Sequence, residues 1–128
     1  MLLSVIVPVF NEEKYIKKIL EKINKIDNIE KQIIVINDGS NDNTLSILKN
    51  ECTELFDEII NCKNNKGKGH ACRLGIQKAK GKIILIQDAD LEYNPENYYD
   101  LIEPILKKKT KVVYGSRVLG DKKRTRPS

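Results

Sequence analysis

The chain has few aromatic residues, five tyrosines and two phenylalanines among 128 residues, and no tryptophan. Its basic residues therefore come without a set of aromatic side chains for stacking on bases, and no known nucleic-acid motif accompanies them, so we expect no nucleic-acid partner. The cysteines are Cys52, Cys62 and Cys72. An odd number at wide spacing argues against both a disulfide framework and a zinc site, so we interpret them as ordinary small apolar residues.

Long hydrophobic runs are also absent. The longest, such as residues 5–9 and 83–86, are far too short to span a bilayer, and the first residues lack the charged-then-apolar pattern of a signal peptide. We therefore expect a cytoplasmic location. With 40% hydrophobic and 32% charged residues, the composition is that of a globular chain of one domain or less.

Positive charge is in excess, with a net charge of +5, and it is concentrated towards the C-terminus. Such a run indicates either a solvated face with a disordered tail, or attraction to phosphate or an anionic membrane surface. The residues concerned are Lys107, Lys108, Lys109, Lys111, Lys122, Lys123, Arg124 and Arg126.

Short β-branched runs alternate with amphipathic segments along the chain. This alternation predicts an α/β fold of the Rossmann-like type: a mainly parallel sheet of about five strands with helices on both faces. In the first run, "LLSVIVPV", we expect Pro8 to end the strand. Strands are predicted at 2–9, 32–38, 56–62, 82–88 and 111–116, and helices at 12–26, around 45–48, and at 71–79 and 95–107.

Polar segments follow the first four predicted strands: "PVFNEE", "NDGSNDNT", "NNKGKGHACRLG" and "QDADLEYNP". Taken singly, each is explained by ordinary turn and capping chemistry. In a parallel α/β sheet, however, ligands bind beyond the carboxyl ends of the strands, and these four segments would all lie there. Together they predict a binding site.

The second and third of these segments offer different groups. Asp38, Gly39 and Ser40 would supply a carboxylate, a flexible turn and a helix cap, and the carboxylate can accept from a base imide or a ribose hydroxyl. The alternative is that Asp38 only caps its helix. Gly67 and Gly69 let backbone N–H groups approach an anion at a helix start, with lysines beside them, although glycines at this spacing are weak evidence. For His70 a capping or surface role is favoured over catalysis, because no partner carboxylate can be assigned.

The fourth segment contains two carboxylates, Asp88 and Asp90, at the end of a buried strand. Residues i and i+2 of an extended segment point the same way, so both can face one ligand. Two close carboxylates repel, and a divalent cation that bridges them to a diphosphate offsets the repulsion. The pair predicts a Mg²⁺ or Mn²⁺ site, the alternative being two solvated turn residues.

At this point the chain is recognisable. The segments "VIVPVFNEE", "VINDGSNDNT", "NKGKGHACRLGIQKAKGKIILIQDADLEYNPE" and "VVYGSR", in this order and spacing, resemble the family 2 glycosyltransferases of the GT-A fold, most closely the branch of dolichol-phosphate or polyprenyl-phosphate mannose and glucose synthases. The likeness covers almost the whole chain. The ordered set of motifs, rather than any single one, carries the resemblance.

The resemblance implies roles for particular residues. Asp88-Ala89-Asp90 is similar to the family's metal and donor-sugar motif, and Arg117 to the arginine that faces phosphate after the fifth strand. These three charged residues would form the catalytic group. The residues expected to bind the nucleotide are Pro8, Phe10, Asn11, Glu12, Asp38, Gly67 and Gly69.

Length is the main departure from the family, whose members continue well past "GSRVLGDKKRTRPS". We expect residues 1–117 to form the donor-nucleotide-binding part of a transferase domain and residues 118–128 to form a basic, mobile tail. The acceptor-facing half would be missing, which would leave apolar surface uncovered and favour self-association.

The resulting hypothesis is a metal-dependent glycosyltransferase that moves a sugar from a nucleoside-diphosphate sugar of the GDP-mannose or UDP-glucose type to a polyprenyl or dolichyl phosphate, at the inner membrane face. Two alternatives remain. One is a nucleotide-sugar-binding module without turnover, because the acceptor half is missing. The other is a nucleotidyltransferase, which should show a loop rich in glycine and arginine after its first strand, and "PVFNEE" is not such a loop.

Overall fold

The computed structural model describes residues 2–87 and 112–115. Within these residues strands and helices alternate, as the sequence predicts. The elements are β1 (Leu2–Val9), α1 (Ile16–Asn24), β2 (Glu30–Asp38), α2 (Thr44–Glu51), β3 (Glu58–Cys62), α3 (Lys68–Lys78), β4 (Ile83–Gln87) and β5 (Val112–Gly115).

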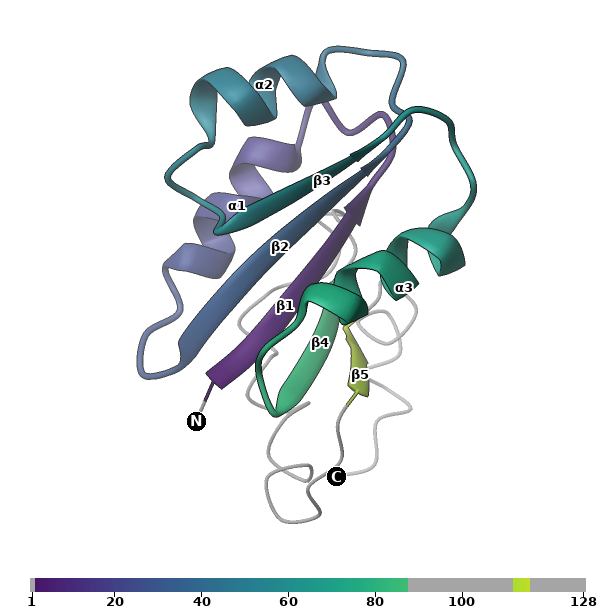
Figure 1. The fold of residues 1–128 in the computed structure, drawn as a ribbon. Coiled ribbons are helices and arrows are strands. Elements are labelled where there is room, and N and C mark those ends of the chain that lie inside the picture. Colours follow the sequence, from purple (N-terminus) through teal and green to yellow (C-terminus); the bar gives the residue numbers. More distant parts are fainter. Residues whose placement is uncertain (1, 88–111, 116–128) are drawn as a thin grey trace, which may run out of the picture.

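The five strands form one parallel sheet in the order β3-β2-β1-β4-β5 (Figure 1). The order reverses next to β1: the chain moves from β1 through β2 to β3 on one side, and then crosses to β4 on the other side. In open α/β sheets a reversal of this kind marks the place where ligands bind, beyond the carboxyl ends of the strands. The predicted α/β class with a mainly parallel sheet is confirmed.

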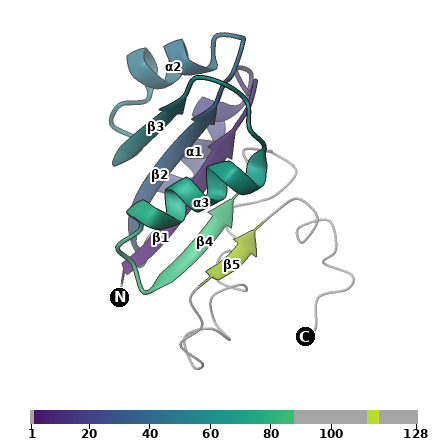
Figure 2. The ribbon, with the colours of Figure 1, turned by 45° about the vertical axis from the view of Figure 1, so that its right-hand side comes forward.

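Helices cover both faces of the sheet, α1 and α2 on one face and α3 on the other (Figures 1 and 2). Successive side chains of a strand point to opposite faces, so one strand serves both layers. In β1, Val5 and Val7 pack with Ile16 and Leu20 of α1, while Ile6 packs towards α3. This is why β1 and β2 read as continuous apolar runs rather than as alternating ones.

Helix α3 lies very close to the sheet at Gly75. A Cβ atom at this position would be 2.4 Å from Cγ2 of Ile6 and 2.8 Å from Cδ1 of Ile36. Both isoleucines are fully buried, so neither can move aside without disturbing its own contacts. Glycine at this position lets α3 pack closely on β1 and β2.

We expect Gly75→Ala to lower the free energy of unfolding by about 1–2 kcal/mol, because overpacking of the core outweighs the better helix propensity of alanine. Gly69→Ala is the matched control in the same helix: the nearest atom to its Cβ would be an Arg73 nitrogen at 4.0 Å. That variant should gain up to about 1 kcal/mol. Urea denaturation of both chains measures the difference, and equal effects would contradict the close approach.

Some predicted element bounds need correction; the third helix, for example, begins at Lys68 rather than at Ala71. The first strand spans the predicted residues 2–9, and Pro8 lies one residue before its end rather than ending it. Within the described residues Pro8 pairs with Ile36 of β2, and β1 pairs with β4 from Leu3 to Ile6. The first helix begins at Ile16 rather than at Glu12, because residues 12–15 form a turn in which the carbonyl of Glu12 accepts from the amides of Tyr15 and Ile16.

Several predictions fall outside the described residues: the helix at 95–107, the division between 117 and 118, and the tail. Within residues 2–87 and 112–115, no helix has the length and apolar character needed to cross a membrane.

Candidate functional site

Three of the four polar segments start side by side at the carboxyl edge of the sheet. The register pairs Val9 with Asn37 and Asp38 with Cys62, so the ends of β1, β2 and β3 are neighbours. We call the loops that follow them, residues 10–15, 39–43 and 63–67, the rim. The fourth segment begins at Asp88, outside the described residues.

The first two rim loops are joined through Asn11. Its amide donates to Oγ of Ser40 at 2.9 Å, and its Oδ1 accepts from the amide of Asn41 at 2.7 Å. Ser40 in turn donates to Oδ1 of Asn37 at 2.5 Å. Ser40 therefore does not cap α2, which starts four residues later, and that prediction is wrong. Both Asn11 and Ser40 hold the rim together.

The start of α2 is held by Asp42 instead. Its Oδ1 accepts from the amide of Thr44 at 2.9 Å, and its Oδ2 accepts from the amide of Glu13 at 3.3 Å. Partial burial acts to raise the pKa of this carboxyl, but the hydrogen bonds from Thr44 and Glu13 outweigh burial and hold the pKa below its usual value. The amide of Glu12 donates to Oγ1 of Thr44 at 2.9 Å, which adds a further link between the loops.

Asp38 joins the second and third rim loops. Its side chain is buried, and it accepts from the amides of Lys66 and Gly67 at 3.0 Å each and from Nδ2 of Asn65 at 3.1 Å. It therefore binds the segment before α3 rather than capping the helix that follows it in sequence. An ionised carboxylate offers about four acceptor positions, and these three donors leave one position for a ligand as far as the described residues go.

The other predicted nucleotide-binding residues have different surroundings. Pro8 is buried in β1, whereas Phe10, directly after that strand, is 40% exposed. Gly67 immediately precedes α3 and Gly69 lies in its first turn. The fold thus brings Phe10 to Glu12, Asp38 and Gly67 to the same edge. Asp88, Asp90 and Arg117 lie outside the described residues, and the roles of all these residues stay predictions.

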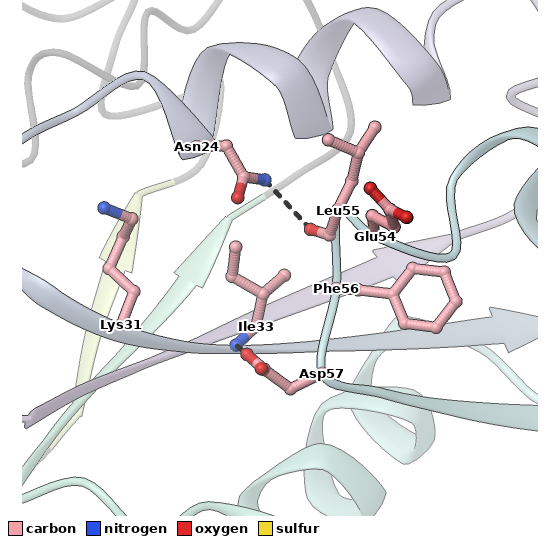
Figure 3. Close-up of a pocket in the computed structure, with 7 residues that line it drawn as sticks. All are labelled: Asn24, Lys31, Ile33, Glu54, Leu55, Phe56 and Asp57. Atoms are coloured by element: carbon pink, nitrogen blue, oxygen red, sulfur yellow. Dashed lines mark hydrogen bonds between the residues drawn. The ribbon is translucent and has the colours of Figure 1, made fainter.

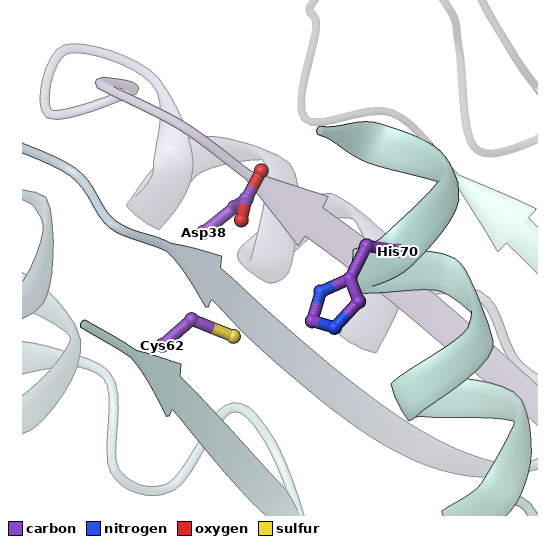
Figure 4. Close-up of side chains that lie close together, drawn as sticks. All are labelled: Asp38, Cys62 and His70. Atoms are coloured by element: carbon purple, nitrogen blue, oxygen red, sulfur yellow. The ribbon is translucent and has the colours of Figure 1, made fainter. Parts of the chain in front are cut away.

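Cys62 and His70 are two residues whose position the sequence analysis did not anticipate. Together with Asp38 they bring one potential ligand atom each to within 4.8 Å of one another, from the ends of β2 and β3 and from α3 (Figure 4). Cys62 is half-buried, and burial, followed by the negative charge of Asp38, raises the pKa of its thiol, with Lys66 acting in the opposite direction. The sequence pointed to this proximity only in that Asp38 and Cys62 are the last residues of two successive predicted strands.

A hollow lies at the opposite, amino end of the strands. This cavity of about 230 Å³ is lined by Asn24, Lys31, Ile33, Glu54, Leu55, Phe56 and Asp57 (Figure 3). Its main polar groups are already used: Asn24 donates to the carbonyl of Leu55 at 2.9 Å, and Asp57 accepts from the amide of Ile33 at 2.7 Å. These contacts fasten the connection between α2 and β3, so we assign the hollow a structural role.

Known proteins resemble this chain along almost its entire length. The model of glycosyl transferase family 2 matches residues 4–128. The chain belongs to this family. A dolichyl-phosphate beta-glucosyltransferase, ALG5D of Trichomonas vaginalis, is 36% identical over 94% of the chain and 41% of its own length. The family inferred from the ordered motifs is therefore confirmed.

Solved structures of other proteins share the fold. Staphylococcus aureus TarS 1–349 in complex with UDP-GlcNAc superposes with a TM-score of 0.64 at 32% identity, covering 70% of this chain and 27% of TarS. The mannosyltransferase PcManGT of Pyrobaculum calidifontis, in complex with GDP-Man and Mn²⁺, gives 0.63 at 29% identity, covering 69% of this chain and 27% of its own. The chain spans less than half the length of these proteins.

Proposed function

We propose that the protein transfers a sugar from a nucleoside-diphosphate sugar to a polyprenyl phosphate, with a divalent metal ion bound at the diphosphate. The observation that carries the proposal is the position of Asp38, a buried carboxylate with one acceptor position left, where three loops meet at the carboxyl edge of the sheet. The UDP-GlcNAc complex of TarS and the GDP-Man complex of PcManGT support a nucleotide-sugar donor.

The nucleoside would lie on the rim. The free acceptor position of Asp38 suits a donor group such as a base imide or a ribose hydroxyl. Phe10 offers an exposed aromatic ring at the neighbouring strand end, against which a flat base can stack. Asn11 and Glu12 are partly committed to the loop contacts described above, so we assign them to shaping this end of the site.

The diphosphate would lie further along the same edge. Asp88 follows the last residue of β4, and Arg117 comes two residues after the end of β5, and both strands run parallel to β1. The chemistry of two carboxylates and an arginine fits this group: Asp88 and Asp90 would hold Mg²⁺ or Mn²⁺, and Arg117 would bind phosphate oxygens. The ion would supply positive charge to the departing diphosphate, as the Mn²⁺ in PcManGT suggests.

In the proposed reaction, an oxygen of the acceptor phosphate attacks the anomeric carbon, and the bond from that carbon to the nucleoside diphosphate breaks. The new glycosyl–phosphate bond forms with inversion, and the electron pair leaves with the diphosphate, which Arg117 stabilises. Because a phosphate acceptor is already ionised at neutral pH, its attack requires no general base. The dolichyl-phosphate relative supports this acceptor class.

A panel of titrations tests the donor and the metal. We expect UDP-glucose or GDP-mannose to bind in the presence of Mn²⁺ and to bind roughly tenfold or more weakly in EDTA, since charge neutralisation at the diphosphate is lost. Asp90→Asn should remove most of the Mn²⁺ dependence. Asp57→Asn is the control, because this carboxylate lies at the amino end of the strands.

If Asp90→Asn weakens nucleotide-sugar binding equally with Mn²⁺ and in EDTA, the metal assignment is rejected. Radiolabelled sugar transfer to a short polyprenyl phosphate then separates the two functional hypotheses: binding with transfer supports the transferase, and binding without transfer supports a nucleotide-sugar-binding module. Absence of binding by every nucleotide sugar would reject both.

A further inference from the structure

Of the cluster of Asp38, Cys62 and His70, only Asp38 has a role in the proposed transfer reaction; Cys62 and His70 have none so far. The cluster combines a carboxylate, a thiol and an imidazole, one from each of three separate elements, with their ligand atoms within 4.8 Å of one another. Figure 4 shows the His70 ring on α3 turned towards the ends of β2 and β3, where the other two side chains lie. These three groups are the ligand types that Zn²⁺ uses in proteins.

We propose that Asp38, Cys62 and His70 form a binding site for a divalent ion of the zinc class. In a tetrahedral site with bonds of about 2.0–2.3 Å, ligand atoms stand roughly 3.3–3.8 Å apart. The separations of at most 4.8 Å exceed this spacing by at most about 1.5 Å, a shift that side-chain rotations of Cys62 and His70 would have to supply. Three protein ligands would leave a fourth position open.

An unpartnered atom supports the site independently. Nδ1 of His70 is buried and has no hydrogen-bond partner among the described residues. A buried polar atom without a partner costs about 1–3 kcal/mol, which binding of an ion would recover. Asp38, in contrast, is held by hydrogen bonds from Asn65, Lys66 and Gly67, and these fix the carboxylate while leaving one acceptor position. A carboxylate that hydrogen bonds already orient, next to an imidazole nitrogen without a partner among the described residues, favours metal binding.

The ligand set also separates this site from the one predicted at Asp88 and Asp90. Mg²⁺ prefers oxygen ligands alone, whereas thiolate and imidazole select Zn²⁺ and related ions. The two sites would therefore take different metals. Access is open, since Cys62 and His70 are only half-buried.

Cobalt is the probe, because Co²⁺ occupies zinc sites and a cobalt–thiolate bond gives a charge-transfer absorption band. Titration of the reduced, metal-free chain should give this band with one Co²⁺ per chain, and one equivalent of Zn²⁺ should remove it. Cys62→Ala and Cys62→Ser should abolish the band, and His70→Ala should weaken Co²⁺ affinity roughly tenfold or more.

Two controls make the assignment specific. Cys52→Ala removes a thiol that is buried at the end of α2, in the core on the other face of the sheet from α3, so the band should be unchanged. Asp90→Asn should also leave the band unchanged. A band that is absent from the wild-type chain, or that survives both Cys62 variants, would overturn the proposal; circular dichroism shows whether each variant is folded.

One consequence rests on the proposed function: because both ligands would use Asp38, a nucleoside diphosphate should displace Co²⁺ and reduce the band. If the band forms and nucleotide leaves it unchanged, the metal site is supported and the nucleotide role of Asp38 is rejected. The failure of one hypothesis can thus be told from failure of the other.

Discussion

Asp38→Ala should lower the free energy of unfolding by about 3 kcal/mol and should reduce nucleotide affinity strongly. The carboxylate accepts two backbone amides and one side-chain amide at 3.0–3.1 Å, and hydrogen bonds to charged groups contribute about 1.5–3 kcal/mol each, in part offset by water reaching the exposed loop. Without it, residues 65–67 lose these three hydrogen bonds to β2, whereas the bond from Nδ2 of Asn65 to the backbone carbonyl of Asp38 at 3.1 Å remains. Urea denaturation and nucleotide titration measure the two effects.

Two further variants show whether the effect depends on this position. Asp38→Asn keeps the shape and one acceptor oxygen, so we expect a loss of stability intermediate between wild type and alanine. Asp57→Ala loses the hydrogen bond that the amide of Ile33 donates to the Asp57 carboxylate, at the other end of the strands. We expect the free energy of unfolding to fall by about 1 kcal/mol and nucleotide affinity to stay unchanged. An Asp38→Ala variant no less stable than Asp57→Ala would contradict the structural role given to Asp38.

Gly39→Ala should have a comparably large effect through the same loop contact. A Cβ atom there would lie 2.4 Å from the backbone nitrogen of Asn65 and 2.5 Å from the carbonyl carbon of Asn64. Backbone atoms cannot rotate aside as a side chain does, and Gly39 also has a φ of +73° that disfavours alanine. We expect a loss of about 3 kcal/mol or more in unfolding free energy, with the third rim loop displaced.

Gly67→Ala serves to separate the cost of a positive φ from the cost of the steric clash at Gly39. Gly67 has a φ of +101°, but no atom lies within 4 Å of its Cβ position, so only backbone strain of about 1–3 kcal/mol applies. Gly39→Ala should be the more damaging variant. When Gly39→Ala is combined with Asp38→Ala, the two losses of unfolding free energy should be less than additive, because both variants break the contact between the end of β2 and the third rim loop. Additive losses would mean that the two residues act independently.

The sequence by itself determined the fold class and most of the core. The β-branched runs at 2–9 and 32–38 can be buried on both faces only in a sheet covered by helices on each side, and Val5, Ile6 and Val7 alternate between the two layers. The recurrence of Ile16, Ile19, Leu20 and Ile23 at helical spacing marks the buried face of α1. These features depend on local periodicity, which a sequence states directly. The ordered motifs likewise identified the family.

Only the tertiary structure decided which loop residues meet. Asp38 forms hydrogen bonds with residues that follow it by 27 to 29 positions in the sequence. Asn11 forms hydrogen bonds with Ser40 and Asn41, which are about as far away in sequence. Such partners depend on the strand order and register, and the short polar residues of a loop can bond to many neighbours with similar energy. The sequence around Ser40 therefore predicts a helix cap, whereas the tertiary structure gives Ser40 other partners, Asn11 and Asn37. Cys62 and His70 carried no periodic signal, and parallel β2 and β3 with α3 above them brought these residues to Asp38.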